Sequence, residues 1–70
     1  MKRKTFVKKI EERGYRVTIV TDGMDIYDDF GWRAFVSDKI PLGINTCSLE
    51  LPNEDYNLLN RYVRTPLDKR

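Results

Sequence analysis

Apolar residues near the start of the chain recur with the period of an α-helix. Phe6, Val7 and Ile10 lie on one face of a helix, and lysines and glutamates occupy the positions around them. Thr5 is the expected N-cap, since a threonine side chain can accept a hydrogen bond from the first helical turn. Gly14 is the expected stop, because a glycine just past the last helical residue adopts positive φ without a steric penalty. The pattern predicts a first helix over residues 4–13.

From residue 15 the apolar period changes to two, which is typical of a β-strand. Tyr15, Val17 and Ile19 alternate with polar residues, and this alternation predicts a strand with one buried face. Asp22 and Gly23 then form a turn signal, because an Asp-Gly pair supplies the positive φ angles of a tight hairpin. An antiparallel strand is therefore expected to follow.

That second strand covers residues 24–28, with Ile26 on one face and Tyr27 on the other. A turn cluster separates it from a third strand at residues 32–37, which is rich in aromatic and apolar residues. Two hairpins in succession predict an antiparallel meander. Residues 42–49 are a candidate fourth strand.

The last helix has a start signal at residues 52–55, where a proline and a capping candidate precede two carboxylates. Its apolar stripe comprises Tyr56, Leu58, Leu59, Tyr62 and Val63. Pro66 disfavours helix at the residue before it, so the helix is expected to end near Arg64. The predicted fold is one α+β domain over residues 1–70 with the order α-β-β-β-α. Two helices pack on one face of an antiparallel sheet of three strands, or of four if residues 42–49 also pair.

Composition narrows the class of protein further. The 70 residues are enough for one hydrophobic core, and they include no histidine and one cysteine. An internal disulfide is therefore excluded, as is a zinc site that combines cysteine with histidine. Cys47 is expected to be a small, half-buried residue. The basic start is not followed by an apolar stretch, and no apolar run approaches the length of a membrane span, so a cytoplasmic protein without a membrane partner is expected.

The sequence lacks the residue patterns that are typical of catalytic sites. Histidine, the commonest general base near neutral pH, is absent, and the glycines lie too far apart for a phosphate-binding loop. We therefore expect no enzyme, no catalytic residue and no cofactor. A carboxylate cluster consists of Asp22, Asp25, Asp28 and Asp29. It lacks the spacing of a calcium loop, so we interpret it as solvated turn and edge-strand charge and expect no metal site.

Charge is distributed unevenly along the chain. The net charge is +5 for residues 1–16, −6 for residues 17–55 and +3 for residues 56–70. If the two basic helices pack side by side, one positive surface can form from Lys4, Lys8, Lys9, Arg61 and Arg64. Such a surface would attract nucleic-acid phosphates. Ordinary solvated helix faces have the same composition, however, and an acidic sheet would repel phosphate.

Aromatic residues give a second candidate surface. Tyr56 and Tyr62 lie on the apolar stripe of the last helix, and Trp32 and Phe35 are expected in the core. Tyr27 lies among aspartates and is the tyrosine expected to be exposed, which makes it the candidate protein-binding residue. A sheet with one uncovered face would also be stabilised by forming a homodimer through that face.

Four short motifs, in this order and spacing, resemble a family of small proteins of unknown function. They are Phe6-Val7-Lys8, Gly14-Tyr15, Val36-Ser37 and the segment 62–70, Tyr-x-x-Thr-Pro-x-x-x-Arg. The family is encoded by phages and prophages of low-GC Gram-positive bacteria. Residues 41–44 depart from its pattern.

The resemblance implies a phage origin and the cytoplasm of a bacterial host, and it brings no catalytic residues. The leading hypothesis is a non-enzymatic phage accessory protein that binds another protein of host or phage. A nucleic-acid-binding module that uses the basic helix face is the alternative.

Overall fold

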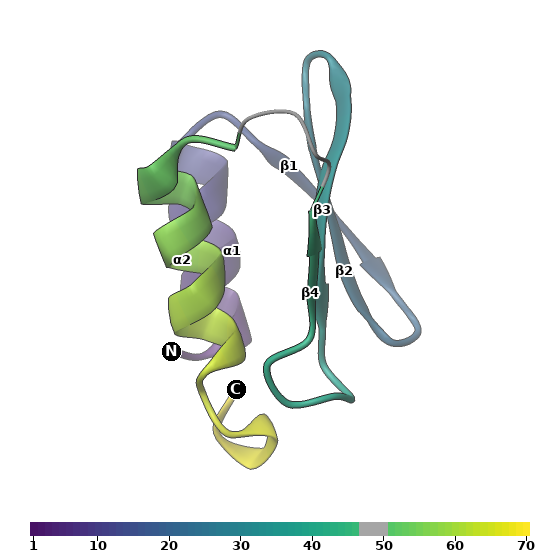
Figure 1. The fold of residues 1–70 in the computed structure, drawn as a ribbon, viewed down its shortest axis with the longest axis vertical. Coiled ribbons are helices and arrows are strands. Elements are labelled where there is room, and N and C mark those ends of the chain that lie inside the picture. The colour runs from purple at the N-terminus through teal and green to yellow at the C-terminus, as the bar shows by residue number, and fades with distance from the viewer. Residues whose placement is uncertain (47–50) are drawn as a thin grey trace.

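The fold combines two helices with one antiparallel sheet. A computed structural model describes residues 1–46 and 51–70. Its elements are α1 (Arg3–Glu12), β1 (Arg16–Val20), β2 (Gly23–Asp28), β3 (Gly31–Ser37), β4 (Ile44–Thr46), α2 (Asn53–Val63) and a short 3₁₀ helix, η1 (Leu67–Lys69). The sheet has four strands in the order β1-β2-β3-β4, and both helices lie on one of its faces (Figure 1). The predicted α+β fold is confirmed, and β4 supplies the fourth strand. Residues 47–49 of that predicted strand, including Cys47, lie outside the described residues.

Helix α1 begins earlier than the sequence predicts. Its N-cap is Lys2, and the backbone N–H of Phe6 donates to the Lys2 carbonyl at 2.9 Å. The expectation of a Thr5 cap is therefore wrong, because this bond already places Thr5 inside the helix. The other end agrees with the sequence, since Gly14 has a φ of 93° and lets the chain turn into β1.

The turn between β1 and β2 uses its glycine differently from the prediction. Val20 pairs with Gly23, so the connection is Thr21 and Asp22, and Gly23 belongs to the strand without a positive φ. A Cβ at Gly23 would lie 2.0 Å from the carbonyl oxygen of Val36. Close approach of β3, not a left-handed turn, is therefore why glycine is needed here.

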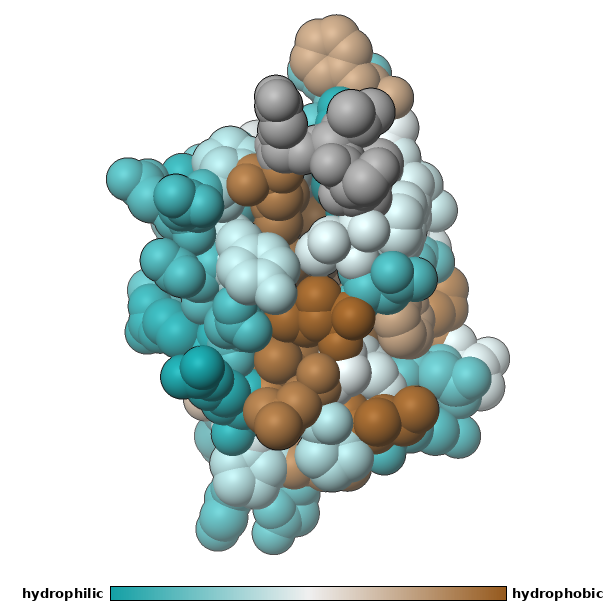
Figure 2. All heavy atoms as spheres, viewed as in Figure 1, coloured by the Kyte–Doolittle hydropathy of each residue, from teal (hydrophilic) through white to brown (hydrophobic). Residues whose placement is uncertain are grey.

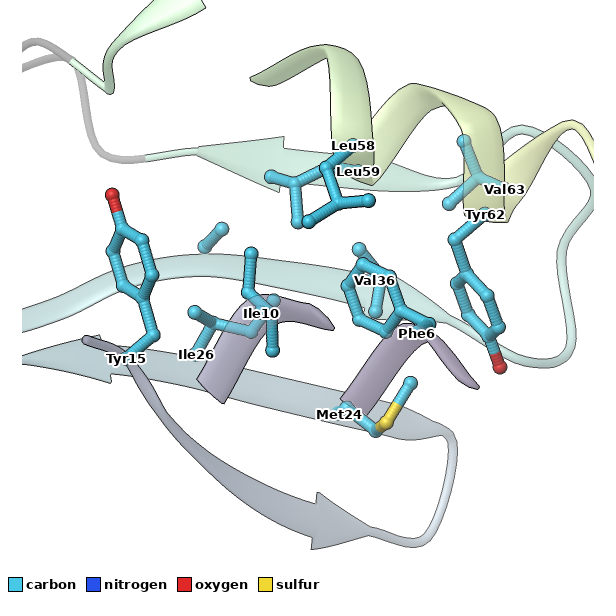
Figure 3. Close-up of a cluster of buried hydrophobic side chains, with 11 residues drawn as sticks. Phe6, Ile10, Tyr15, Met24, Ile26, Val36, Leu58, Leu59, Tyr62 and Val63 are labelled. Atoms are coloured by element: carbon cyan, nitrogen blue, oxygen red, sulfur yellow. The ribbon is translucent and has the colours of Figure 1, made fainter. Parts of the chain in front are cut away.

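One hydrophobic core lies between the helices and the sheet. Figure 3 shows its side chains converging from both helices and from the inner faces of β2 and β3. Its buried members are Phe6, Ile10, Tyr15, Met24, Ile26, Ala34, Val36, Leu58, Leu59, Tyr62 and Val63. The rings of Phe6 and Tyr62 stack with their centroids 4.5 Å apart, which joins α1 to α2.

Two side chains predicted to be buried are exposed. Ile19 is 59% exposed, because it lines an open groove between α1 and β1. Tyr56 is 41% exposed, whereas its neighbour Asp55 is buried. Asp55 accepts hydrogen bonds from Arg13 and Tyr15, and these bonds turn the Asp55 side of α2 toward the body of the protein.

Candidate functional site

The face of the sheet that points away from the helices carries three aromatic side chains. Residues paired across antiparallel strands share a face. Asp25 pairs with Phe35, and Tyr27 pairs with Trp32. We call this helix-free surface the open face. Its members in the described strands are Arg16, Thr18, Val20, Gly23, Asp25, Tyr27, Trp32, Phe35, Ser37 and Asn45.

A β-bulge places Trp32 on the open face. The register of β2 and β3 shifts beside Tyr27, and Arg33 is the extra residue. In a regular strand, residues two apart share a face, so Trp32 would lie on the same side as the buried Ala34, facing the helices. Instead, Trp32 Nε1 donates a hydrogen bond to Asp25 Oδ1 at 3.0 Å. The prediction that Trp32 belongs to the core is therefore wrong.

The other two aromatic residues lie beside it. Phe35 is half-buried and stands between the buried Ala34 and Val36 in the sequence, so strand alternation places it on the opposite face. Its assignment to the core was also wrong, and the same alternation could have corrected it. Tyr27, the residue proposed from the sequence for protein binding, lies on the open face opposite Trp32. It is half-buried beside its neighbours on the sheet, so the expectation that it is the exposed tyrosine is wrong; Tyr56 is the exposed one.

The four clustered aspartates have four different partners. Asp25 accepts from Trp32, Asp28 pairs with Arg33 at 2.6 Å, Asp29 pairs with Arg16 at 3.3 Å, and Asp22 pairs with Lys39 at 3.3 Å. The hydrogen bond from Arg33 is the main reason that the pKa of Asp28 is lowered. Within the described ranges, no group of three or more His, Cys, Asp or Glu residues is arranged to hold a metal ion.

The loop between β3 and β4, residues 38–43, presents two aliphatic side chains to solvent. Ser37 Oγ accepts hydrogen bonds from the N–H groups of Lys39 at 3.1 Å and Ile40 at 2.9 Å. Gly43 then donates to the Ile40 carbonyl at 3.1 Å, which closes the loop. Ile40 is 65% exposed and Leu42 is 66% exposed, and Leu42 has a φ of 62°. A leucine held at positive φ is strained, so these contacts impose the shape of the loop.

A groove of about 500 Å³ joins this loop to the open face. Phe35, Ile40 and Ile44 give it apolar walls, and the ion pair of Asp22 with Lys39 lies at its rim. Figure 2 shows the adjoining surface, where apolar side chains gather between α2 and β4 and toward the β3–β4 loop. Hydrophilic side chains cover the outer side of α2 in the same view.

The predicted basic surface is divided between two grooves. Lys4 and Lys8 line the groove between α1 and β1, whereas Lys9 and Arg61 line a groove between α1 and α2. Two glutamates, Glu12 and Glu54, share the second groove. Arg64 is exposed at the end of α2 and lines neither groove. The helices pack side by side as expected, but the five basic residues do not share one continuous groove.

No family model, curated protein or solved structure matches the chain. Similarity to characterised proteins therefore contributes nothing to a functional assignment, which rests on side-chain chemistry. In the part of the chain that the structure describes, the helices are too short and too polar to cross a membrane.

A polar cluster around Asp38 ties the end of the chain to the sheet. Tyr62 donates to Asp38 Oδ1 at 2.6 Å, Arg70 pairs with the same oxygen at 3.1 Å, and Arg3 pairs with Oδ2 at 3.0 Å. Burial by itself would raise the pKa of Asp38. The Tyr62 hydroxyl and the two guanidinium groups outweigh it, so the pKa lies below its ordinary value. Burial and the hydrogen bond to Asp38 raise the pKa of Tyr62.

A fully buried carboxylate, Asp55, joins the ends of the two helices. Asp55 accepts from Arg13 Nε and from the hydroxyl of Tyr15, and Arg13 also pairs with Glu54 at 3.1 Å. Burial is the main reason that the pKa of Tyr15 is raised. The partly buried Asp38 and the buried Asp55 both have cationic partners, so these clusters are suited to holding the fold together.

Proposed function

We propose that the protein acts by binding another protein through the open face and the β3–β4 loop. The observation that carries this proposal is the gathering of Tyr27, Trp32 and Phe35 on the one sheet face that no helix covers. Aromatic side chains are the residues most enriched at the centres of protein interfaces. Ile40 extends the apolar surface beyond the end of β3, and the groove between Phe35 and Ile40 can accept an apolar side chain of a partner.

The ion pairs around this surface support the same role. Asp28 with Arg33 and Asp29 with Arg16 bring charged groups together around the aromatic residues. A polar rim around an apolar centre is the usual arrangement in interfaces between proteins that also exist apart. The proposed role is non-enzymatic. The partly buried Asp38 and the buried Asp55 both pair with arginines, an arrangement that supports a fold.

A photo-crosslinking amino acid at position 35 or 40 tests the proposal directly, because it traps only a protein that contacts the groove. Tyr27→Ala should weaken that capture by about tenfold or more. Tyr56→Ala is the matched control, since it removes the same side chain from the exposed surface of α2. Equal capture by the two variants, each shown to be folded by circular dichroism, would contradict the proposal.

The resemblance to phage-encoded proteins extends this proposal to the partner. We propose that the partner is a host or phage protein and that the two meet in the cytoplasm of a bacterial host. Mass spectrometry of the product crosslinked at position 40 identifies that partner. A partner that is secreted or embedded in a membrane would contradict the proposed location.

Nucleic-acid binding is the second candidate, and the lining of the groove beside β1 favours it. This groove has a volume of about 640 Å³ and contains Lys2, Lys4 and Lys8, with Glu11 as its one acidic residue. Binding of a short DNA duplex should then weaken steeply as salt increases, and Lys8→Glu should reduce it more than Arg61→Glu. Binding to DNA that does not depend on salt, or on Lys8, would contradict this alternative.

A further inference from the structure

Strand β1 is an exposed sheet edge with apolar side chains. It pairs with β2 on one side and is the terminal strand of the sheet in the part of the chain that the structure describes. Alternate residues of an edge strand direct their N–H and C=O groups away from the sheet, where they can pair with another strand. Ile19 and Val20 are both exposed, and Arg16 is the one charged residue of β1. Such an edge is a template for strand pairing.

The sequence of β1 is complementary to itself in the antiparallel direction. A two-fold axis through Thr18 places Val17 opposite Ile19 of a second copy, and Ile19 opposite Val17 of that copy. In the described sheet these two residues face the helices, since they pair with Ile26 and Met24 of the core. Two apolar cross-strand pairs would therefore form beside the existing core, and each stabilises an antiparallel pair.

Helix α1 shows the same self-complementarity above the strand. Lys4, Val7, Lys8 and Glu11 have the spacing of one helical stripe, and all four line the groove that also contains Ile19. The centre of this stripe lies between Val7 and Lys8 and faces the same groove as Ile19. Because Ile19 is next to Thr18, the two-fold axis through Thr18 also passes near the centre of the stripe. When the two-fold axis passes near the centre of the stripe, the α1 helices of the two copies lie antiparallel. Lys4 of each copy then lies beside Glu11 of the other. Within the described chain, neither Lys4 nor Glu11 takes part in an ion pair.

We propose that two copies of the chain associate through the β1 edge and the facing stripe of α1. The β1 strands pair antiparallel about Thr18, and two Lys4–Glu11 ion pairs form between the helices. The sheets of the two copies then become continuous, with all helices on one side and both open faces on the other. The dimer goes beyond the proposed binding function, since it leaves Tyr27 and Phe35 free and presents two binding faces together.

A second copy fits this edge better than an unrelated strand. Any extended peptide can supply backbone groups to β1. Lys4 and Glu11 on the α1 stripe additionally need a partner that carries a glutamate opposite Lys4 and a lysine opposite Glu11, in a layer above the added strand. A second α1 helix provides that pair by symmetry. Val7, half-buried in the same groove, adds an apolar contact near the axis.

Sedimentation equilibrium over a concentration series tests the dimer with charge-reversal variants. Wild-type protein should reach twice the monomer mass. Lys4→Glu and Glu11→Lys should each weaken self-association by about tenfold or more, since both ion pairs become repulsive. An equimolar mixture of the two variants should recover wild-type association as a mixed dimer, because glutamates of one copy then face lysines of the other.

Matched controls separate this interface from other surfaces. Lys9→Glu and Glu12→Lys reverse the same charges on the other flank of α1 and should leave association within about twofold of wild type. Tyr27→Ala should also leave it unchanged, whereas Ile19→Lys should abolish it. A monomeric wild-type protein, a dimer that Tyr27→Ala disrupts, or a charge-reversed mixture that fails to recover association would each overturn the proposal.

Discussion

Replacing Arg70 by alanine tests whether the polar cluster around Asp38 stabilises the fold. The Arg70 side chain is only 4% exposed and its guanidinium has four acceptors. Nε donates to the carbonyl of Thr65 at 3.0 Å, Nη2 donates to the carbonyl of Val63 at 2.9 Å, and Nη1 contacts both Asp38 and the carbonyl of Ser37. Arg70→Ala removes these bonds together and leaves acceptors beneath the surface without a donor.

The expected cost follows from these contacts. Hydrogen bonds to a charged group contribute about 1.5–3 kcal/mol each, and breaking a buried ion pair costs about 3–5 kcal/mol. The contributions of bonds that share one guanidinium do not add, and Arg3 and Tyr62 still hold Asp38 after the change, so the loss is close to that of one or two such bonds. We expect Arg70→Ala to lower the free energy of unfolding by about 2–4 kcal/mol. That is a large part of the roughly 4–10 kcal/mol available to a domain of this size.

Urea unfolding followed by far-ultraviolet circular dichroism measures this difference, with fluorescence of Trp32, the one tryptophan, as a second probe. Lys69→Ala is the control, because the neighbouring Lys69 is exposed and should change stability by no more than about 0.5 kcal/mol. If Arg70→Ala costs no more than Lys69→Ala, the cluster does not stabilise the fold in the way that its geometry indicates.

The same variant makes a prediction about pH. The folded pKa of Asp38 lies below its ordinary value of 3.8, so ionised Asp38 stabilises the folded state above that pH. This contribution is lost as the pH falls below 3.8 and passes through the lowered folded pKa. Because Arg70 is one cause of the lowering, the stability gap between wild type and Arg70→Ala should narrow as the pH falls from 7 to 3. If the stability difference between wild type and Arg70→Ala is the same at pH 7 and pH 3, Arg70 does not stabilise the ionised form of Asp38.

Three further predictions use the same unfolding measurement. Arg13→Ala should cost about 1.5–3 kcal/mol, because it removes the cation from the buried Asp55 carboxylate while the Tyr15 hydroxyl still donates to it, and a loss below about 0.5 kcal/mol would contradict that pairing. Phe6→Ala should cost about 3–5 kcal/mol by opening a cavity against Tyr62, and a loss below about 1 kcal/mol would show that the core closes over the space. Ile40→Asp should change stability by no more than about 0.5 kcal/mol while reducing capture of a partner at the open face. Reduced capture together with a loss of stability would show that Ile40 supports the fold instead.

The order of the elements and most of their bounds could be predicted from the sequence. Short-range periodicity carries this information, because a helix and a strand repeat every 3.6 and two residues. Gly14 ends α1 with the expected positive φ, and the first three strands lie where alternation places them. The candidate site was less predictable. Tyr27 was placed on the correct side of the sheet, but Trp32 and Phe35 were assigned to the core.

The errors have separate physical causes. Phe35 follows strict alternation, and its aromatic character outweighed its position beside the buried Ala34. Trp32 depends on a bulge at Arg33, which one extra residue creates and which has no signal in the local pattern. Asp55 was predicted only as one of two carboxylates at a helix start, and its burial depends on Arg13, 42 residues away.

The sequence by itself determined the α+β class, the two helices and the antiparallel meander, since each depends on neighbours within a few residues. Only the tertiary structure decided which sheet face stays uncovered, which strand lies at the edge, and which charges are buried together. These features depend on pairings between distant residues, such as Arg70 with Asp38 and Arg13 with Asp55. Local periodicity does not predict such pairings, because they form only when the packed elements bring the side chains within hydrogen-bonding distance.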